Sequence, residues 1–421
     1  MKKILLKDTL LDGRRTDVLI AGNRFAKIAP GIAADAETEV ADAAGTAILP
    51  PFCNAHTHAA MTLLRGYADD MELFKWLNEH IWPFEAKMSA RDVYEASRLA
   101  ILEMIRSGTV FFNDMYWHSD ETARAAREMG VRASVGMTLT EFIGEKKIEA
   151  TFERLAELPH GGHVGDEGRV RLALAPHAVY TVREKLWRRC TEFARERGLT
   201  LHIHLAETKK EVEDCVAEHG MTPVRWLDSL GVLGENVVAA HVVHVDDEEI
   251  AILRERGVTV AHNPCSNMKL GSGVFRAAAF ARSGCRVALG TDGNASNNNL
   301  DMREEAKFAA LLAKVSGDPE ALPAETALAW ATRAGARAFG LDAGEIAEGR
   351  LADALLVDLN DVRMTPCHNL VSNWIYSADT RCIRDVICDG RFLMRDRVVP
   401  GEEEILASAR AVVDALLAEK R

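Results

Sequence analysis

Residues 287–293, VALGTDG, form a short apolar run that ends in Thr291, Asp292 and Gly293. Seven similar runs precede it, separated for the most part by helical patterns: residues 48–58, 109–115, 132–139, 170–177, 199–207, 237–245 and 258–264. Eight strands that alternate with helices over about 300 residues predict an α/β fold of the (β/α)8 TIM-barrel type. A doubly wound sheet is the competing architecture, but no GxGxxG or P-loop motif supports a nucleotide-cofactor fold.

The two ends of the chain have a different pattern. Residues 17–31 alternate in polarity around a turn at Gly22-Asn23, and residues 352–360 and 385–399 do the same with a turn at Asp389-Gly390. We expect a small β-sandwich domain from residues 1–50 and 350–400, a barrel over residues 51–349 and a C-terminal helix over residues 401–421. The clearest helix is expected from Ala90 to Ser107, capped by Ser89 and Asp92 and ended by Gly108.

Composition excludes several classes of protein. The 421 residues are 48% hydrophobic and 27% charged, and 51 Lys and Arg against 63 Asp and Glu give a net charge of −12. An acidic chain without a basic run is poorly suited to nucleic acid. The start has no signal-peptide pattern, no run of about 18 apolar residues occurs, and the eight cysteines are scattered without a CxxC pair. We therefore expect a cytoplasmic protein that binds neither nucleic acid nor membrane.

Histidines stand at the carboxyl ends of the first and fifth predicted strands, where barrel enzymes carry their chemistry. His56 and His58 are two residues apart on one strand, so both side chains can face the barrel axis and one metal ion. His204 lies nearer the barrel mouth than His202, which makes His204 the better ligand and His202 a packed or supporting residue. Glu207 follows where the strand becomes a loop, as a general acid or base could; an exposed loop glutamate is the alternative.

The sixth and eighth strands add two further candidates. His241 and His244 have odd spacing, so at most one of them points inward, and His241 directly follows the apolar run. Asp292 ends the eighth strand between glycines and is a suitable metal ligand or proton acceptor. Any one of these residues could be incidental, whereas their joint placement at four strand ends favours a metal site.

This set resembles the metal-site pattern of the amidohydrolase superfamily. The chain is most similar to its S-adenosylhomocysteine/5′-methylthioadenosine deaminases, which are related to s-triazine hydrolases. The similar stretches cover nearly the whole chain: NAHTHAAMTLLRG, WPFEAKM, FNDMY, APHAVYT, HLAET, AAHVVHV, NPCSNMKLGSG and LGTDGNASNNNLDM.

The resemblance implies a role for each matching position. One divalent ion, zinc or iron, would be bound by four ligands: His56, His58, His204 and Asp292. Catalytic groups would be Glu207, His241 and Asp292. Substrate contacts would come from Glu85 to a ribose diol, His177 to the purine ring, Trp76 beside the sugar, and Ser296 close to Asp292. The resemblance also implies a homo-oligomer.

Two departures refine the expected chemistry. Family members that accept adenosylhomocysteine use arginines near the third strand, where this chain has Met137, and Arg132 and Arg154 are not clean replacements. This favours neutral 5′-substituents. The fourth strand has no lysine that could become carboxylated and bridge two ions, which favours one metal ion.

The expected function is hydrolytic deamination of an adenine nucleoside, such as 5′-methylthioadenosine, 5′-deoxyadenosine, adenosine or S-adenosylhomocysteine, to an inosine-type product and ammonia. A metal held by imidazoles and a carboxylate lowers the pKa of its water toward about 7, and Glu207 can protonate the ring nitrogen beside the attacked carbon. An s-triazine hydrolase is the first alternative, and Glu85 discriminates because a ring without ribose needs no diol acceptor. A non-catalytic scaffold is the second, and the complete set of ligand positions argues against it.

Overall fold

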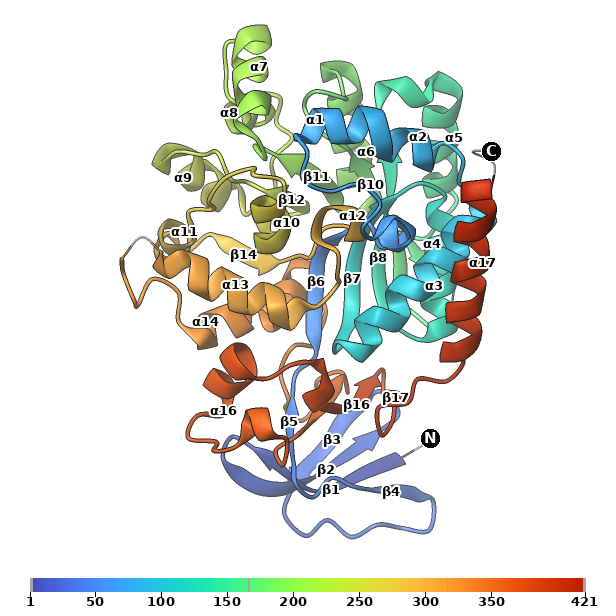
Figure 1. The fold of residues 1–421 in the computed structure, drawn as a ribbon, viewed down its shortest axis with the longest axis vertical. Helices are drawn as coiled ribbons and strands as arrows, with labels where there is room; N and C mark the ends of the chain where they lie inside the picture. The colour runs from blue at the N-terminus through green and yellow to red at the C-terminus, as the bar shows by residue number, and fades with distance from the viewer. Residues whose placement is uncertain (1–2, 166, 316, 419–421) are drawn as a thin grey trace.

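The eight predicted barrel strands all form in the computed structural model, which describes residues 3–165, 167–315 and 317–418 (Figure 1). The strands are β6 (Phe52–Thr57), β7 (Thr109–Tyr116), β8 (Arg132–Leu139), β10 (Val170–Pro176), β11 (Leu201–Leu205), β12 (Val237–His241), β13 (Thr259–His262) and β14 (Arg286–Leu289). They pair in parallel in chain order from β6 to β14, and a short β9 (His163–Val164) pairs with β10. The predicted (β/α)8 barrel is confirmed, and the doubly wound sheet is wrong.

The first and last barrel strands meet through side chains as well as backbone. Asn54 Nδ2 donates to Thr291 Oγ1 at 2.7 Å, and Asn54 Oδ1 accepts from the Thr291 N–H at 3.1 Å. The N–H of Asp292 donates to the His56 carbonyl at 3.0 Å. This seam brings the end of β14 beside the end of β6, so two of the predicted metal ligands become neighbours.

Helices surround the barrel because its strands are buried on both faces and need apolar cover. The helix α3 (Ala90–Arg106) has the predicted ends: Ser89 and Asp92 form a capping box, and Gly108 follows with φ of +85°. The other helices around the barrel are η1 (Ala59–Leu64), α1 (Leu73–Trp76), η2 (Leu77–Ile81), α2 (Trp82–Glu85), α4 (Ser119–Met129), η3 (Glu141–Ile143), α5 (Glu145–Ala156), α6 (Glu184–Arg197), α7 (Lys209–His219), α8 (Pro223–Ser229), α9 (Asp247–Arg256), α10 (Pro264–Lys269), α11 (Ala277–Ser283), α12 (Asn294–Asn297), α13 (Met302–Lys314), α14 (Ala324–Ala329), η4 (Trp330–Ala334) and α15 (Gly335–Ala338).

A second sheet is built from both ends of the chain, as predicted. Its strands are β1 (Lys3–Leu11), β2 (Arg14–Ala21), β3 (Arg24–Ala29), β4 (Thr38–Asp42), β5 (Thr46–Leu49), β15 (Ala354–Asp358), β16 (Ile383–Cys388) and β17 (Arg391–Met394). Hydrogen bonding joins them into one mixed sheet in the order β17-β16-β15-β5-β1-β2-β3, with β4 paired to β1, and the sheet has an apolar core of its own around Phe25 and Leu356. The domain limits at residues 50 and 350 stay a prediction.

The two predicted turns of this sheet form and pack together. Asn23 Nδ2 donates to Asp389 Oδ1 at 3.1 Å, and a Cβ on Gly390 would lie 2.0 Å from the Gly22 carbonyl oxygen. Only glycine fits at position 390, where φ is also +70°. The turn therefore ties the first and last parts of the sheet to each other.

Between β15 and β16, residues 359–382 include four short helical segments: η5 (Val362–Met364), α16 (Leu370–Ser372), η6 (Asn373–Ser377) and η7 (Thr380–Cys382). The last helix, α17 (Glu402–Ala418), runs back along the barrel beside α3 (Figure 1). Arg98 and Arg106 of α3 form ion pairs with Glu404 and Glu402 of α17. Among the residues that the structure describes, no helix is both long and apolar enough to cross a membrane.

Candidate metal and catalytic site

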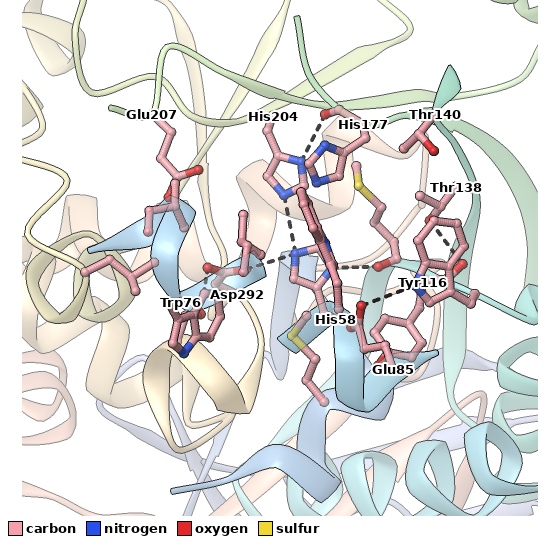
Figure 2. A pocket seen from close by; sticks show the side chains of 18 of the residues that line it. His58, Trp76, Glu85, Tyr116, Thr138, Thr140, His177, His204, Glu207 and Asp292 are labelled. Carbon is pink, nitrogen blue, oxygen red and sulfur yellow. Dashed lines mark hydrogen bonds and ion pairs between the residues drawn. The ribbon is translucent and has the colours of Figure 1, made fainter. Parts of the chain in front are cut away.

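Four donor groups converge at the carboxyl end of the barrel, and Figure 2 shows three of them, His58, His204 and Asp292. His56 Nε2 and His58 Nε2 each lie 3.2 Å from Asp292 Oδ1, and His204 Nε2 lies 3.3 Å from His58 Nε2. The two histidines of β6 share a side of the strand because their spacing is two residues. The structure thus brings together the four residues predicted as metal ligands.

His58 and His204, two of the histidines predicted as metal ligands, each have their Nδ1 held by a partner outside the cluster. His58 Nδ1 lies 2.6 Å from the Met115 carbonyl oxygen, and His204 Nδ1 lies 3.0 Å from the His177 carbonyl oxygen. A carbonyl only accepts, so each Nδ1 carries the proton and each Nε2 presents a lone pair to the centre. Two lone pairs 3.3 Å apart repel unless a cation lies between them, and this donor set fits a divalent metal ion.

His202 supports His56, the third histidine predicted as a metal ligand. Its Nε2 lies 2.8 Å from His56 Nδ1, and its Nδ1 lies 3.3 Å from the carbonyl oxygen of Asp114. Both rings are fully buried. His202 therefore orients His56 from behind, in the supporting place that its position on the fifth strand suggested.

Asp292 presents one carboxylate oxygen to the histidines and keeps the other occupied. Asp292 Oδ2 accepts from Ser266 Oγ at 2.6 Å and from Ser296 Oγ at 2.8 Å. Burial opposes ionisation of this carboxyl, but the His56 and His58 imidazoles beside it hold its pKa well below the ordinary range. Its φ of +60° is strained for a non-glycine residue, and such strain is common where a fold holds a functional side chain in place.

His241 stands beside the cluster at the end of β12, also with positive φ (+72°). Its Nδ1 lies 2.9 Å from Asn267 Oδ1, an acceptor, so this nitrogen carries the proton and Nε2 is free to accept. That Nε2 lies 3.8 Å from Glu207 Oε2. His244 points elsewhere and contacts the Ser272 carbonyl oxygen at 2.6 Å, so of the two histidines after strand six, His241 faces the site.

Glu207 is buried at the mouth of the same cavity, with 5% of its surface exposed. Ser272 Oγ donates to its Oε1 at 3.4 Å. Burial raises the pKa of the Glu207 carboxyl, which favours a protonated acid. The alternative of an exposed loop glutamate is therefore wrong.

The predicted substrate-binding side chains line this cavity too (Figure 2). Glu85 is buried, accepts from Trp117 Nε1 at 3.3 Å, and leaves its other carboxylate oxygen without a partner within the described chain. His177 Nδ1 lies 3.1 Å from Thr181 Oγ1, so Nε2 is the ring nitrogen left for a ligand. The Trp76 indole N–H is used by the Ala68 carbonyl at 3.0 Å, so this residue offers the cavity only its ring face.

Residues of α10 support the site and were not singled out individually from the sequence. Ser266 donates to Asp292, and Asn267 contacts His241, so this short helix holds two of the groups predicted to handle protons. Both residues lie in the stretch NPCSNM, which directly follows the seventh barrel strand. Polar residues at that strand end were the signal that could have identified them.

The arginines considered for a carboxylate-binding role are engaged elsewhere. Arg132 is buried at the start of β8, where its guanidinium lies 2.8 Å from Asp353 and 2.7 Å from Asp389. These two aspartates adjoin β15 and β16 of the second sheet. Arg154 of α5 pairs with Asp120 at 2.8 Å. Neither guanidinium is among the described residues that line the cavity with His58, His204 and Asp292.

A second cavity of about 790 Å³ adjoins the first beyond Glu85. The two cavities share Trp82, Glu85, Tyr116, Trp117, Thr138 and Phe142. Met88, Met137 and Ile143 give its wall an apolar part. Its charged lining residues, within the described parts of the chain, are Glu85, Asp120, Glu121 and Lys147.

Comparison with known proteins places this arrangement in a family. Residues 47–393 match the sequence profile of the amidohydrolase family. The chain is 46% identical over 395 residues to a 5′-deoxyadenosine deaminase of Methanothermobacter thermautotrophicus, covering 93% of this chain and 91% of that protein. It is 47% identical over 365 residues to a 5-methylthioadenosine/S-adenosylhomocysteine deaminase of Dictyoglomus thermophilum, covering 86% and 85%.

A solved structure agrees with these relatives in fold. The adenosine deaminase from Xanthomonas campestris, with bound zinc, superposes with a TM-score of 0.92 at 35% identity, covering 99% of this chain and 98% of that one. The predicted resemblance to the amidohydrolase superfamily is confirmed. The chain belongs to the amidohydrolase family.

Proposed function

We propose that this protein is a metal-dependent hydrolytic deaminase of adenine nucleosides. The observation that carries the proposal is one cavity lined by the donors His58, His204 and Asp292, the buried acid Glu207 and the buried carboxylate of Glu85. The fully buried His56 completes the donor set beside them. The names of its relatives at 46% and 47% identity support the same reaction.

One divalent ion per chain, zinc or iron, would be held by His56, His58, His204 and Asp292. A divalent ion in such a set lowers the pKa of a bound water toward about 7 and so supplies the hydroxide nucleophile. A single ion is supported by the fourth barrel strand, whose residues 170–176 (VRLALAP) include no lysine that could bridge two metals. Zinc is supported by the metal in the similar solved structure.

The chain's own groups would handle the protons of the reaction. His241 would accept a proton at Nε2, because Asn267 holds the other proton on Nδ1. Asp292 is close enough to share this role, since its carboxylate oxygen lies within 4.8 Å of a His241 ring nitrogen. Glu207, protonated as its raised pKa favours, would donate to the ring nitrogen beside the attacked carbon and then carry a proton to the departing ammonia. Burial strengthens these transfers because no solvent shell competes for the charge.

Glu85 would recognise the ribose. Its unpartnered buried oxygen is costly unless a ligand donates to it, and a ribose diol supplies such donors. His177 would contact the purine through Nε2, Trp76 would pack beside the sugar, and Ser296, which already donates to Asp292, would contact substrate only through its remaining acceptor capacity.

An s-triazine hydrolase is the alternative in the same family. A triazine ring carries no diol, so it would leave the Glu85 carboxylate buried without a donor. A non-catalytic scaffold is disfavoured because the ligand and proton-transfer positions are filled and converge.

The 5′-side of the substrate would lie toward the second cavity, beyond Glu85. The lining there includes Met88, Met137 and one cation, Lys147. The negative charges of Asp120 and Glu121 in the same lining outweigh the single positive charge of that lysine. Burial of an unpaired carboxylate costs several kcal/mol. We therefore propose that a neutral 5′-group, as in 5′-deoxyadenosine or methylthioadenosine, is preferred over the zwitterionic tail of adenosylhomocysteine.

A substrate series tests the function directly. Adenosine, 5′-deoxyadenosine, methylthioadenosine and adenosylhomocysteine would be compared by loss of adenine absorbance, with 2′,3′-dideoxyadenosine as the diol-free control. We expect the dideoxy compound to be poor and adenosylhomocysteine to have a lower kcat/KM than methylthioadenosine. Equal turnover of the dideoxy compound would refute the role of Glu85, and no turnover of any adenine nucleoside would refute the function.

We also propose a homo-oligomer in the cytoplasm. The eight cysteines are free thiols in the structure, which is typical of a reducing compartment, and the oligomer is implied by the family resemblance. Light scattering of the purified protein measures the oligomeric state, and a monomer would contradict this part of the proposal.

A further inference from the structure

The segment that carries Glu207 is held in an unusual backbone conformation. After β11 the chain turns at Ala206, whose φ is +50°, and α7 then begins at Lys209. The Ala206 carbonyl accepts from the N–H groups of Val243 and His244, each at 3.0 Å. One side of the turn is thus tied to the end of the sixth strand, beside His241.

The other side of the turn is held by a second buried glutamate, Glu211. Its Oε1 accepts from the Ala206 N–H at 2.9 Å and its Oε2 accepts from the Glu207 N–H at 2.8 Å. Glu211 is 2% exposed. Both oxygens of one carboxylate therefore bind the two backbone donors at the root of the Glu207 side chain.

Ordinary helix capping does not account for this contact. Thr208 caps α7 and accepts from the Glu211 N–H at 3.1 Å, so the sequence Thr208-Lys209-Lys210-Glu211 fits a capping box. In a capping box the glutamate reaches back to the N–H of the capping residue. Glu249 of α9 does so, accepting from the Asp246 N–H at 2.9 Å. Glu211 instead passes the cap and binds the two residues before it.

The neighbouring charges of α7 serve a different purpose. Glu213 is exposed and pairs with Lys209 at 3.2 Å, and Lys210 pairs with Asp214 at 2.8 Å. Exposed pairs of this kind contribute little to stability. Within the charge-rich run from 207 to 214, only Glu207 and Glu211 are buried, and Glu211 lies against Glu207 rather than the solvent.

We propose that Glu211 is a positioning residue for the reaction, which fixes the backbone of Glu207 so that its carboxyl reaches the substrate and His241. Without it, two buried N–H groups would lose their acceptor, and the strained turn at Ala206 would relax. A displacement of about 1 Å in a catalytic group can cost roughly 10²-fold in rate. This inference rests on the proposed deaminase activity of the same site.

The first test compares Glu211→Gln with the matched control Glu213→Gln. The amide of Gln has one acceptor oxygen and places an N–H₂ against a backbone N–H, so one of the two bonds must break. We expect kcat to fall roughly 10- to 10²-fold with little change in KM or metal content, while the control stays at the parent level. Unchanged kcat in Glu211→Gln, or loss of its metal, would overturn the proposal. If this variant does not fold, Glu211→Asp, which is shorter by one methylene, is measured in the same way.

A double-mutant cycle separates positioning from a general structural role. If Glu211 acts only through Glu207, adding Glu211→Gln to Glu207→Gln should lower kcat no further, to within about twofold. Multiplying losses would overturn the proposal.

Hydrogen exchange tests the contact itself without any substrate. A peptide covering residues 205–208 should exchange faster in Glu211→Gln than in the parent, and unchanged protection would also overturn it. A parent enzyme that deaminates no adenine nucleoside would refute the proposed function, whereas the exchange result would still report on the Glu211 contact.

Discussion

Glu207→Gln is the sharpest test of the proposed chemistry. The substitution keeps the size of the side chain and its contact with Ser272 Oγ, which lies 3.4 Å from Glu207 Oε1. It removes only the ability to give up and regain a proton. Because Glu207 is 5% exposed, bulk water cannot replace the lost acid at that position.

The expected magnitude follows from that isolation. Loss of a positioned acid or base lowers the rate by roughly 10²- to 10⁴-fold, which is about 2.7 to 5.5 kcal/mol of barrier. KM should change by less than about threefold, since an interaction used only in the transition state affects kcat rather than binding. Metal content should equal that of the parent. Among the described residues, two groups of side chains could hold an ion, and Glu207 belongs to neither: His56, His58 and His204 form one, and His56, His241 and Asp292 the other.

The assay is steady-state deamination followed by loss of adenine absorbance, with metal measured by mass spectrometry on the same preparation. Glu213→Gln, on the exposed side of α7, is the control and should match the parent. A Glu207→Gln protein that purifies without metal would show that Glu207 is a ligand. A kcat within threefold of the parent would show that it is not the acid.

Three further results are expected. Removal of metal by a chelator should abolish turnover and restoration of about one equivalent per chain should recover it, whereas a requirement for two equivalents at full activity would contradict the single-ion site. Asn267→Ala should lower kcat by roughly 10-fold or more with metal retained, because His241 Nδ1 loses the acceptor 2.9 Å away that sets its tautomer; kcat at the parent level would contradict this role. Burial alone would raise the pKa of Asp389, but pairing with Arg132 outweighs burial and holds that pKa below its ordinary value. The stability from this pair is therefore present above about pH 4 and is lost as pH falls through the folded-state pKa. Asp389→Asn should therefore be about 1 to 3 kcal/mol less stable at pH 7, with a smaller difference below pH 4 in thermal unfolding; an equal difference at both pH values would refute the assignment.

Much of the site could be predicted from the sequence because it depends on local geometry. The two-residue spacing of His56 and His58 places both rings on one side of a strand whatever surrounds it. Asp292 and His204 stand at the ends of apolar runs, and in a barrel all such ends open on one face. The capping of α3 by Ser89 is local in the same way, and the structure reproduces it.

Other features were decided only by the tertiary structure. Glu211 and Glu213 look alike in a charge-rich run, and the packing of α7 against the barrel buries one and exposes the other. Arg132 follows a turn and could have faced the active site, but the terminal sheet places Asp353 and Asp389 beside it at the opposite end of the strand.

The physical reason is the range over which each signal acts. Strand periodicity and helix caps depend on residues two to four positions apart, so the sequence by itself determined which residues stand at the barrel mouth. The partners of those residues lie far along the chain, as Asn267 does for His241 and Ser266 does for Asp292. Their contacts exist only once the strands close into a barrel, and closure therefore decided which polar side chains became supports of the site.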